Sequence, residues 1–161
     1  MKKVLTIVMA MALVLSMSVC AFAANVSTDG GQANVEVSYG VDQVFEVSIP
    51  ENVQFAQGAL TKTGTVEATK VLIPNGKKLT VDVTSGNDYN LVYEGSKIAY
   101  TVTGEALLTA QAATALTVES GSTSGSQQLT FATDEGKIAA ATKAGTHKDT
   151  LTFTCAIGDI A

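Results

Sequence analysis

The C-terminal part of the chain has the clearest pattern of apolar and polar positions. Between residues 150 and 157, larger apolar side chains alternate with Thr and Ala, so that one face carries Leu151, Phe153, Cys155 and Ile157. A period of two residues is typical of a half-buried β-strand. No helix of matching length follows to cover the apolar face. This stretch is therefore predicted to be the last strand of an antiparallel sandwich.

Shorter stretches with the same alternation precede it. Strands are expected over residues 35–41, 44–49, 65–73, 79–83, 89–93, 98–102, 116–118 and 129–131. The turn Pro-Asn-Gly-Lys at 74–77 predicts a hairpin, because Pro fixes φ and Asn-Gly tolerates positive φ. About eight to ten short strands with turn signals every 8–12 residues predict an all-β, antiparallel, immunoglobulin-like β-sandwich. Residues 105–113 contain helix formers, so at most one short helix is expected there.

The N-terminal region has the organisation of an export signal. Two lysines precede an apolar run over residues 4–19, and Ala-Phe-Ala follows at 21–23. This pattern predicts a secretory signal peptide, residues 1–23, that is removed by cleavage. A membrane anchor would need about 20 apolar residues, and a lipoprotein would carry a smaller residue than Val19 before the lipidated cysteine.

The remaining chain divides into an arm and a domain. Residues 24–34 are polar and Gly-rich and are expected to form a flexible N-terminal arm. Residues 35–161 have the length of a single β-sandwich domain. The expected location is secreted, either extracellular or at the cell surface, with no membrane contact after cleavage.

The charge balance excludes one large class of partner. The chain has 15 acidic residues and 10 lysines but no arginine, a formal net charge of −5, which becomes −7 when Lys2 and Lys3 leave with the signal peptide. Nucleic acid is not an expected partner, since phosphates require clustered basic side chains. If Cys20 also leaves, Cys155 is the remaining cysteine. It is expected to be a buried thiol, with an intermolecular disulfide as the alternative.

Residues for catalysis or metal binding are sparse. His147 is the only histidine and no Gly-x-Ser-x-Gly elbow is present, which disfavours a Ser-His-Asp hydrolase. One His and one Cys do not supply a tetrahedral zinc site, and the acidic turn at 134–136 lacks EF-hand spacing. The sequence predicts a non-enzymatic protein without a cofactor, while paired carboxylates that meet only in space stay open.

Two stretches resemble a group of known proteins. The sequence Ala-Gly-Thr-His-Lys-Asp-Thr-Leu-Thr-Phe at 144–153, and the strand that ends in Ile49-Pro50, are similar to parts of small secreted bacterial β-sandwiches. These include fimbria-like and spore-coat subunits and cell-wall proteins similar to the WxL group. The resemblance implies a Gram-positive type surface protein with a structural or adhesive role. The Trp-x-Leu motif is absent, so peptidoglycan binding is not implied.

Two functional hypotheses follow. The first is a cell-surface structural or adhesion-type protein that assembles with itself, or with other surface proteins, by donating its first strand to a neighbour's sheet. The side chains expected to fill the neighbour's groove are Val35, Val37, Tyr39 and Val41. The alternative is that this first strand pairs within its own domain. The second hypothesis is a soluble module that binds a glycan or protein through exposed aromatic side chains. Its candidates are Tyr89, Tyr93 and Tyr100, with Tyr39 as a fourth.

Overall fold

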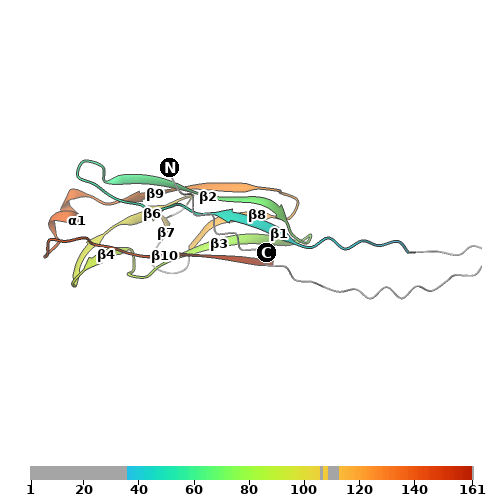
Figure 1. Ribbon diagram of the computed structural model, residues 1–161. Helices are drawn as coiled ribbons and strands as arrows, with labels where there is room; N and C mark the ends of the chain where they lie inside the picture. The colour runs from blue at the N-terminus through green and yellow to red at the C-terminus, as the bar shows by residue number, and fades with distance from the viewer. Residues whose placement is uncertain (1–35, 106, 109–112, 161) are drawn as a thin grey trace, which may run out of the picture.

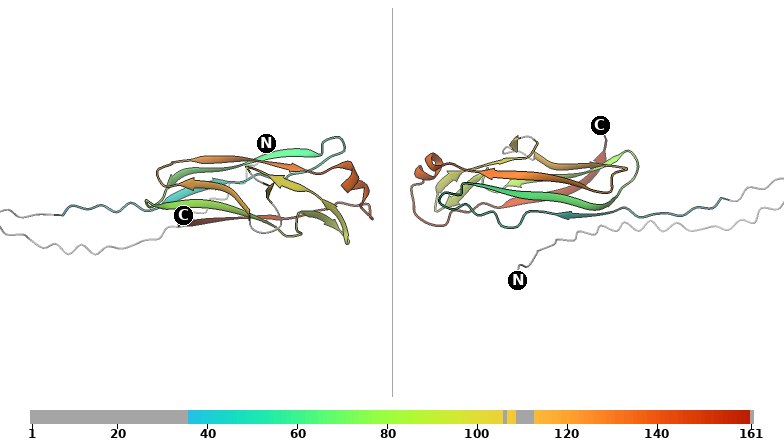
Figure 2. Two further views of the ribbon diagram at one scale, coloured as in Figure 1. Left: turned by 180° about the vertical axis from the view of Figure 1, so that it is seen from behind. Right: turned by 90° about the horizontal axis from the view of Figure 1, so that it is seen from above.

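The structure is a computed structural model that describes residues 36–105, 107–108 and 113–160 (Figure 1). Two antiparallel sheets face each other, which confirms the predicted all-β, sandwich-like fold (Figures 1 and 2). The elements are β1 (Val44–Ser48), β2 (Thr61–Leu72), β3 (Lys77–Ser85), β4 (Asn90–Tyr93), β5 (Ser96–Ala99), β6 (Thr101–Thr103), β7 (Leu107–Leu108), β8 (Ala113–Glu119), β9 (Gly125–Ala132), α1 (Glu135–Ala139) and β10 (Leu151–Asp159).

The strands divide into one large sheet, one small sheet and a separate hairpin. The large sheet has the order β1-β2-β9-β6-β7, the small sheet has the order β10-β3-β8, and β4 pairs with β5. The predicted last strand is confirmed: β10 pairs with β3 through nine consecutive residue pairs, from Leu151 opposite Ser85 to Asp159 opposite Lys77. The edge strands β1 and β10 lie on the same flank of the sandwich, because the segment after β1 and the start of β10 line one groove.

The core lies between the two sheets and follows the alternation of the sequence. Inward side chains of the central strands are fully buried, while their neighbours along each strand face solvent. The fully buried side chains include Val66, Leu79, Val81, Val83, Val102, Leu129 and Phe131. Burial of such side chains contributes roughly 1.5–3 kcal/mol each relative to exposure, so these positions supply most of the driving force for folding.

The prediction that the strands on either side of residues 74–77 pair as a hairpin is wrong. The turn itself forms, since Lys77 N donates to Pro74 O at 3.2 Å and Gly76 has a φ of +76°. However, β2 and β3 do not pair with each other and belong to different sheets. Apolar side chains of both strands belong to the same core cluster, so the turn carries the chain from one sheet to the other.

The helix expected around residues 105–113 is also corrected. Within the described part of that stretch, residues 107–108 form β7 and Ala113 begins β8; residues 106 and 109–112 lie outside the described residues. In the part of the chain that the structure describes, the helix is α1, at a place where the sequence predicts a turn. It begins after Asp134, whose Oδ1 accepts a hydrogen bond from Lys137 N at 2.8 Å and satisfies a free N–H of the first turn.

The expected first strand over residues 35–41 does not form a ladder. From Glu36 to Gln43 the described chain has no strand assignment, and β1 starts only at Val44. All three views place this segment beyond the end of the sandwich, as a continuation of β1 away from the sheets (Figures 1 and 2). A strand needs a neighbour for its N–H and C=O groups, and no described part of the chain lies alongside. Val35 and the expected signal peptide and arm lie outside the described residues.

Candidate functional site

Two of the candidate binding tyrosines lie inside the protein. Tyr89, before β4, and Tyr100, between β5 and β6, are each 6% exposed. Their rings meet edge to face, with centroids 5.8 Å apart, and the ring of Phe55 lies 6.3 Å from that of Tyr100. These rings therefore belong to the core at one end of the sandwich rather than to a surface platform.

The other two tyrosines lie apart from this pair. Tyr93 in β4 is half-buried and its ring centroid is 5.7 Å from that of His147. Tyr39 is 91% exposed, on the segment that precedes β1. The structure thus does not bring the candidate tyrosines together into an exposed cluster, because the two that meet, Tyr89 and Tyr100, point into the core.

Asp149 holds the start of β10 against the rest of the sandwich. Its Oδ2 accepts hydrogen bonds from Ser85 Oγ and Tyr100 Oη, both at 2.6 Å, and its Oδ1 accepts from Thr150 N at 2.7 Å. Burial, and then the carboxylate of Asp149, raise the pKa of Tyr100 well above its ordinary value. A single carboxylate therefore links the end of β3, the core tyrosine and the first residues of the last strand.

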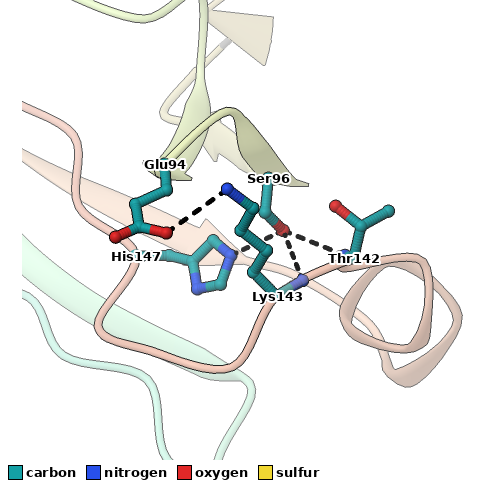
Figure 3. Close-up of polar contacts among 5 residues, drawn as sticks. All are labelled: Glu94, Ser96, Thr142, Lys143 and His147. Carbon is teal, nitrogen blue, oxygen red and sulfur yellow. Dashed lines mark hydrogen bonds and ion pairs between the residues drawn. The ribbon is translucent and has the colours of Figure 1, made fainter.

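A second polar centre forms around the buried hydroxyl of Ser96 (Figure 3). Ser96 Oγ accepts hydrogen bonds from Thr142 N at 3.0 Å and Lys143 N at 3.3 Å, and lies 2.9 Å from His147 Nε2. With both lone pairs of Oγ used, its hydrogen donates to Nε2. The proton of the neutral ring is then on Nδ1, which donates to Gly145 O at 3.1 Å.

Ser96 and His147 are as close as a catalytic nucleophile and its base, but a substrate could not reach the serine hydroxyl. Catalysis of that kind requires a hydroxyl that a substrate can reach, and Ser96 is only 2% exposed. The third member is also a backbone carbonyl, Gly145 O, rather than a carboxylate. The nearby Lys143–Glu94 ion pair, 3.3 Å long, adds to the contact between the two segments (Figure 3). The arrangement fastens residues 142–147 onto β5.

The described residues contain no group of three or more His, Cys, Asp or Glu side chains placed to hold a metal ion. Within the same part of the chain, no helix has the length and apolar character needed to cross a membrane.

A groove opens between the two sheets on the flank of β1 and β10. Its volume is about 510 Å³. One wall is the segment that follows β1, including Pro50 and Val53, and the other is the start of β10, including Leu151 and Phe153. The buried Phe131 also lines it. The groove thus reaches the core between the sheets, at a place where no strand of the described chain covers it.

The candidate donor residues directly precede β1 in the sequence, but they do not line the groove. Val37, Tyr39 and Val41 are 92%, 91% and 68% exposed. Cys155, expected to be a buried thiol, is half-buried on the inward face of β10 and forms no disulfide. Burial, and then the charge of Asp82, raise the pKa of this thiol, which lowers its thiolate fraction and its reactivity at neutral pH.

Searches for related proteins gave no match to a family model, to a curated protein or to a solved structure. The resemblance to secreted bacterial β-sandwiches therefore stays a prediction, and function has to be argued from the geometry.

The Ser96 centre predicts a specific loss of stability. Ser96→Ala removes the acceptor of two backbone N–H groups and the donor to His147, so the free energy of unfolding should fall by about 1–3 kcal/mol. Urea unfolding measures this change. Ser122→Ala, at an exposed position, is the control and should change stability by no more than about 0.5 kcal/mol. Equal effects of the two substitutions would contradict a structural role for the Ser96 centre.

The raised pKa of Tyr100 predicts loss of stability at alkaline pH. The folded chain keeps this proton at pH values where the unfolded chain has released it, so stability is full below the ordinary tyrosine pKa of 10.0 and falls as the pH rises above it. The slope reaches at most about 1.4 kcal/mol per pH unit for one tyrosine. Urea unfolding between pH 9 and 11 should show a shallower slope for Tyr100→Phe than for the unsubstituted protein. Tyr39→Phe, at an exposed position, should leave the slope as it was; an unchanged slope in Tyr100→Phe would refute the assignment.

Proposed function

We propose that this protein is a secreted, non-enzymatic structural subunit that assembles with copies of itself by donating an N-terminal strand. The observation that carries the proposal is the segment before β1. Residues 36–43 have no ladder partner in the described chain, and the apolar side chains of Val37 and Tyr39 are 92% and 91% exposed. A strand in this state offers both backbone edges and an apolar face to another molecule.

The alternation of this segment suits a groove better than a solvent-exposed linker. Apolar side chains occupy alternate positions from Val35 to Val41, while Glu36, Ser38 and Gly40 occupy the positions between. Flexible linkers are normally rich in small and polar residues. Full burial of each large apolar side chain would contribute about 1.5–3 kcal/mol to binding, and main-chain hydrogen bonds would fix the direction of the strand.

The cellular setting fits the same proposal. The pattern of residues 1–23 supports export, and the acidic, arginine-free composition supports a soluble exterior. The similarity of residues 144–153 to fimbria-like and spore-coat subunits supports a surface role. In this reading the partner is a second copy of the chain, and neither nucleic acid nor a cofactor takes part.

The glycan-binding alternative gains no support from the tyrosines. Tyr89 and Tyr100 are both only 6% exposed and Tyr93 packs on His147, whereas sugar platforms need exposed aromatic faces. We therefore propose self-assembly alone.

Deletion of the donor segment is the direct test. The secreted protein should form polymers that appear in light scattering and as filaments in negative-stain electron microscopy. A variant that lacks residues 24–41 should remain a monomer, because it keeps the groove but has lost the strand that fills it. A deletion variant that polymerises like the parent, or a parent that stays monomeric at all concentrations, would rule out strand donation.

Point variants separate the two faces of the segment. Val37→Asp places a charge on the face expected to enter the groove, and Ser38→Asp places the same charge on the opposite face. The fraction of polymer at a fixed concentration should fall at least about tenfold for Val37→Asp, since a buried unpaired carboxylate is strongly unfavourable. Ser38→Asp should assemble like the parent. A similar loss in both variants would indicate charge repulsion rather than insertion of an apolar face.

A further inference from the structure

The edge of β10 has less protection than the edges of β1, β7 and β8. Natural edge strands are usually short, bulged, charged or interrupted by Pro, which prevents pairing with other chains. β1 has five residues, an irregularity between Val44 and Glu46, and Pro50 soon after its end. β7 has two residues, and the pairing of β8 shifts opposite Val81 and Asp82. β10 has nine residues in unbroken register with β3, and residues 151–158 contain neither a charged residue nor Pro.

The backbone of β10 leaves a regular set of hydrogen-bonding groups at this edge. Thr150 O accepts from Gly86 N at 2.9 Å, and Ile160 N donates to Gly76 O at 3.0 Å, so the even-numbered residues turn their backbone groups toward the β3 side. Alternation in an antiparallel ladder then directs the N–H and C=O groups of the odd-numbered residues to the opposite edge. Within the described chain, the strand order places no neighbour at that edge.

The same odd-numbered residues carry the incompletely covered part of the core. On β3 the inward side chains of Leu79, Val81 and Val83 are 0% exposed. One strand further out, every inward side chain of β10 packs against the core but is only partly buried. These side chains are Leu151, Phe153, Cys155 and Ile157. Together with the groove between the segment after β1 and the start of β10, this decline in burial leaves an incompletely covered apolar strip along β10.

We infer that the free edge of β10 is the acceptor site, and that its occupant is the segment Val35–Val41 of a second copy of this chain. This inference rests on the proposed function and assigns the surface at which it acts. The lengths agree, since seven donor residues fit along nine acceptor residues. The alternation also agrees, because four apolar positions of the donor would lie beside four partly buried apolar positions of β10 on one face of the sheet.

A second copy suits the geometry better than the same copy. The segment leads directly into Val44 and continues the line of β1 beyond the end of the sandwich, which is also the end at which β10 finishes (Figures 1 and 2). For the segment to enter its own groove, the chain would have to reverse direction at residues 42–43. In a neighbouring copy the extended segment can enter without that reversal, and each copy then offers one donor and one acceptor, which gives an open chain of subunits.

Cys155 provides a native reporter on the acceptor strand. We would express the full chain with single substitutions Val37→Cys, Tyr39→Cys and Val41→Cys, and with the matched controls Ser38→Cys and Gly40→Cys. After mild oxidation, non-reducing gels and peptide mass spectrometry would identify disulfides to Cys155. A disulfide requires Cβ atoms about 3.5–4.5 Å apart, and side chains on opposite faces of a sheet do not meet this condition. At least one of the first three variants should give about tenfold more intermolecular disulfide to Cys155 than either control.

A second measurement needs no new cysteine. In the unsubstituted protein, alkylation of Cys155 by N-ethylmaleimide should be about tenfold slower in polymers than in the monomeric variant that lacks residues 24–41, because the apolar side chains of the donor would pack beside Cys155 and restrict access to its thiol. Equal rates, or equal cross-linking by inward and outward variants, in protein that does polymerise would overturn the β10 acceptor and leave self-assembly standing. A disulfide within one chain would overturn donation to a second copy. A parent that forms no polymer would overturn both the function and the acceptor.

Discussion

The ladder between β3 and β10 is the interaction on which the rest of this structure depends. Nine consecutive pairs join the last strand to the most deeply buried strand of the small sheet. The same ladder uses only one edge of β10, and it aligns the four inward side chains of that strand along the open flank. A regular strand that carries no charge over residues 151–158 and has one free edge contributes to the core and can also act as a template for another strand. Stability and the proposed assembly therefore come from the same element.

Two polar centres keep the start of β10 in place. Asp149 connects the last residue of β3 with Tyr100 through two hydrogen bonds of 2.6 Å, and Ser96 holds residues 142–147 through His147 and two backbone N–H groups. β4, the partner of the strand that carries Ser96, lies with α1 at the end of the sandwich away from the projecting segment (Figure 1). The anchoring is thus concentrated at one end of β10, while its free edge and inward side chains continue toward the other end, where the chain leaves β1.

The sequence predicted the class of fold because burial follows alternation. The period of two over residues 150–157 is enough to locate β10 and its inward face. The same period over residues 35–41 identified a strand-like segment but not its neighbour, since a pattern reports which side chains share a face and not what lies alongside. The turn at 74–77 was recognised from its chemistry, yet turn chemistry does not say which sheet each flanking strand joins. The links from Ser96 to His147 and from Ser85 to Asp149 join residues far apart in sequence and have no local signal.

The proposed assembly also explains how one chain can carry both an exposed apolar segment and an open groove. Each feature alone is a liability, because exposed apolar strands and free sheet edges promote uncontrolled association. When the donor of one copy occupies the acceptor of the next, both would be covered and the small sheet would gain an additional strand. Only the two ends of the polymer then keep an uncovered donor or acceptor. The polymer would then grow by addition of subunits at those ends. The exposed segment and the free edge of β10, which are uncovered in the isolated chain, would cover each other along the polymer.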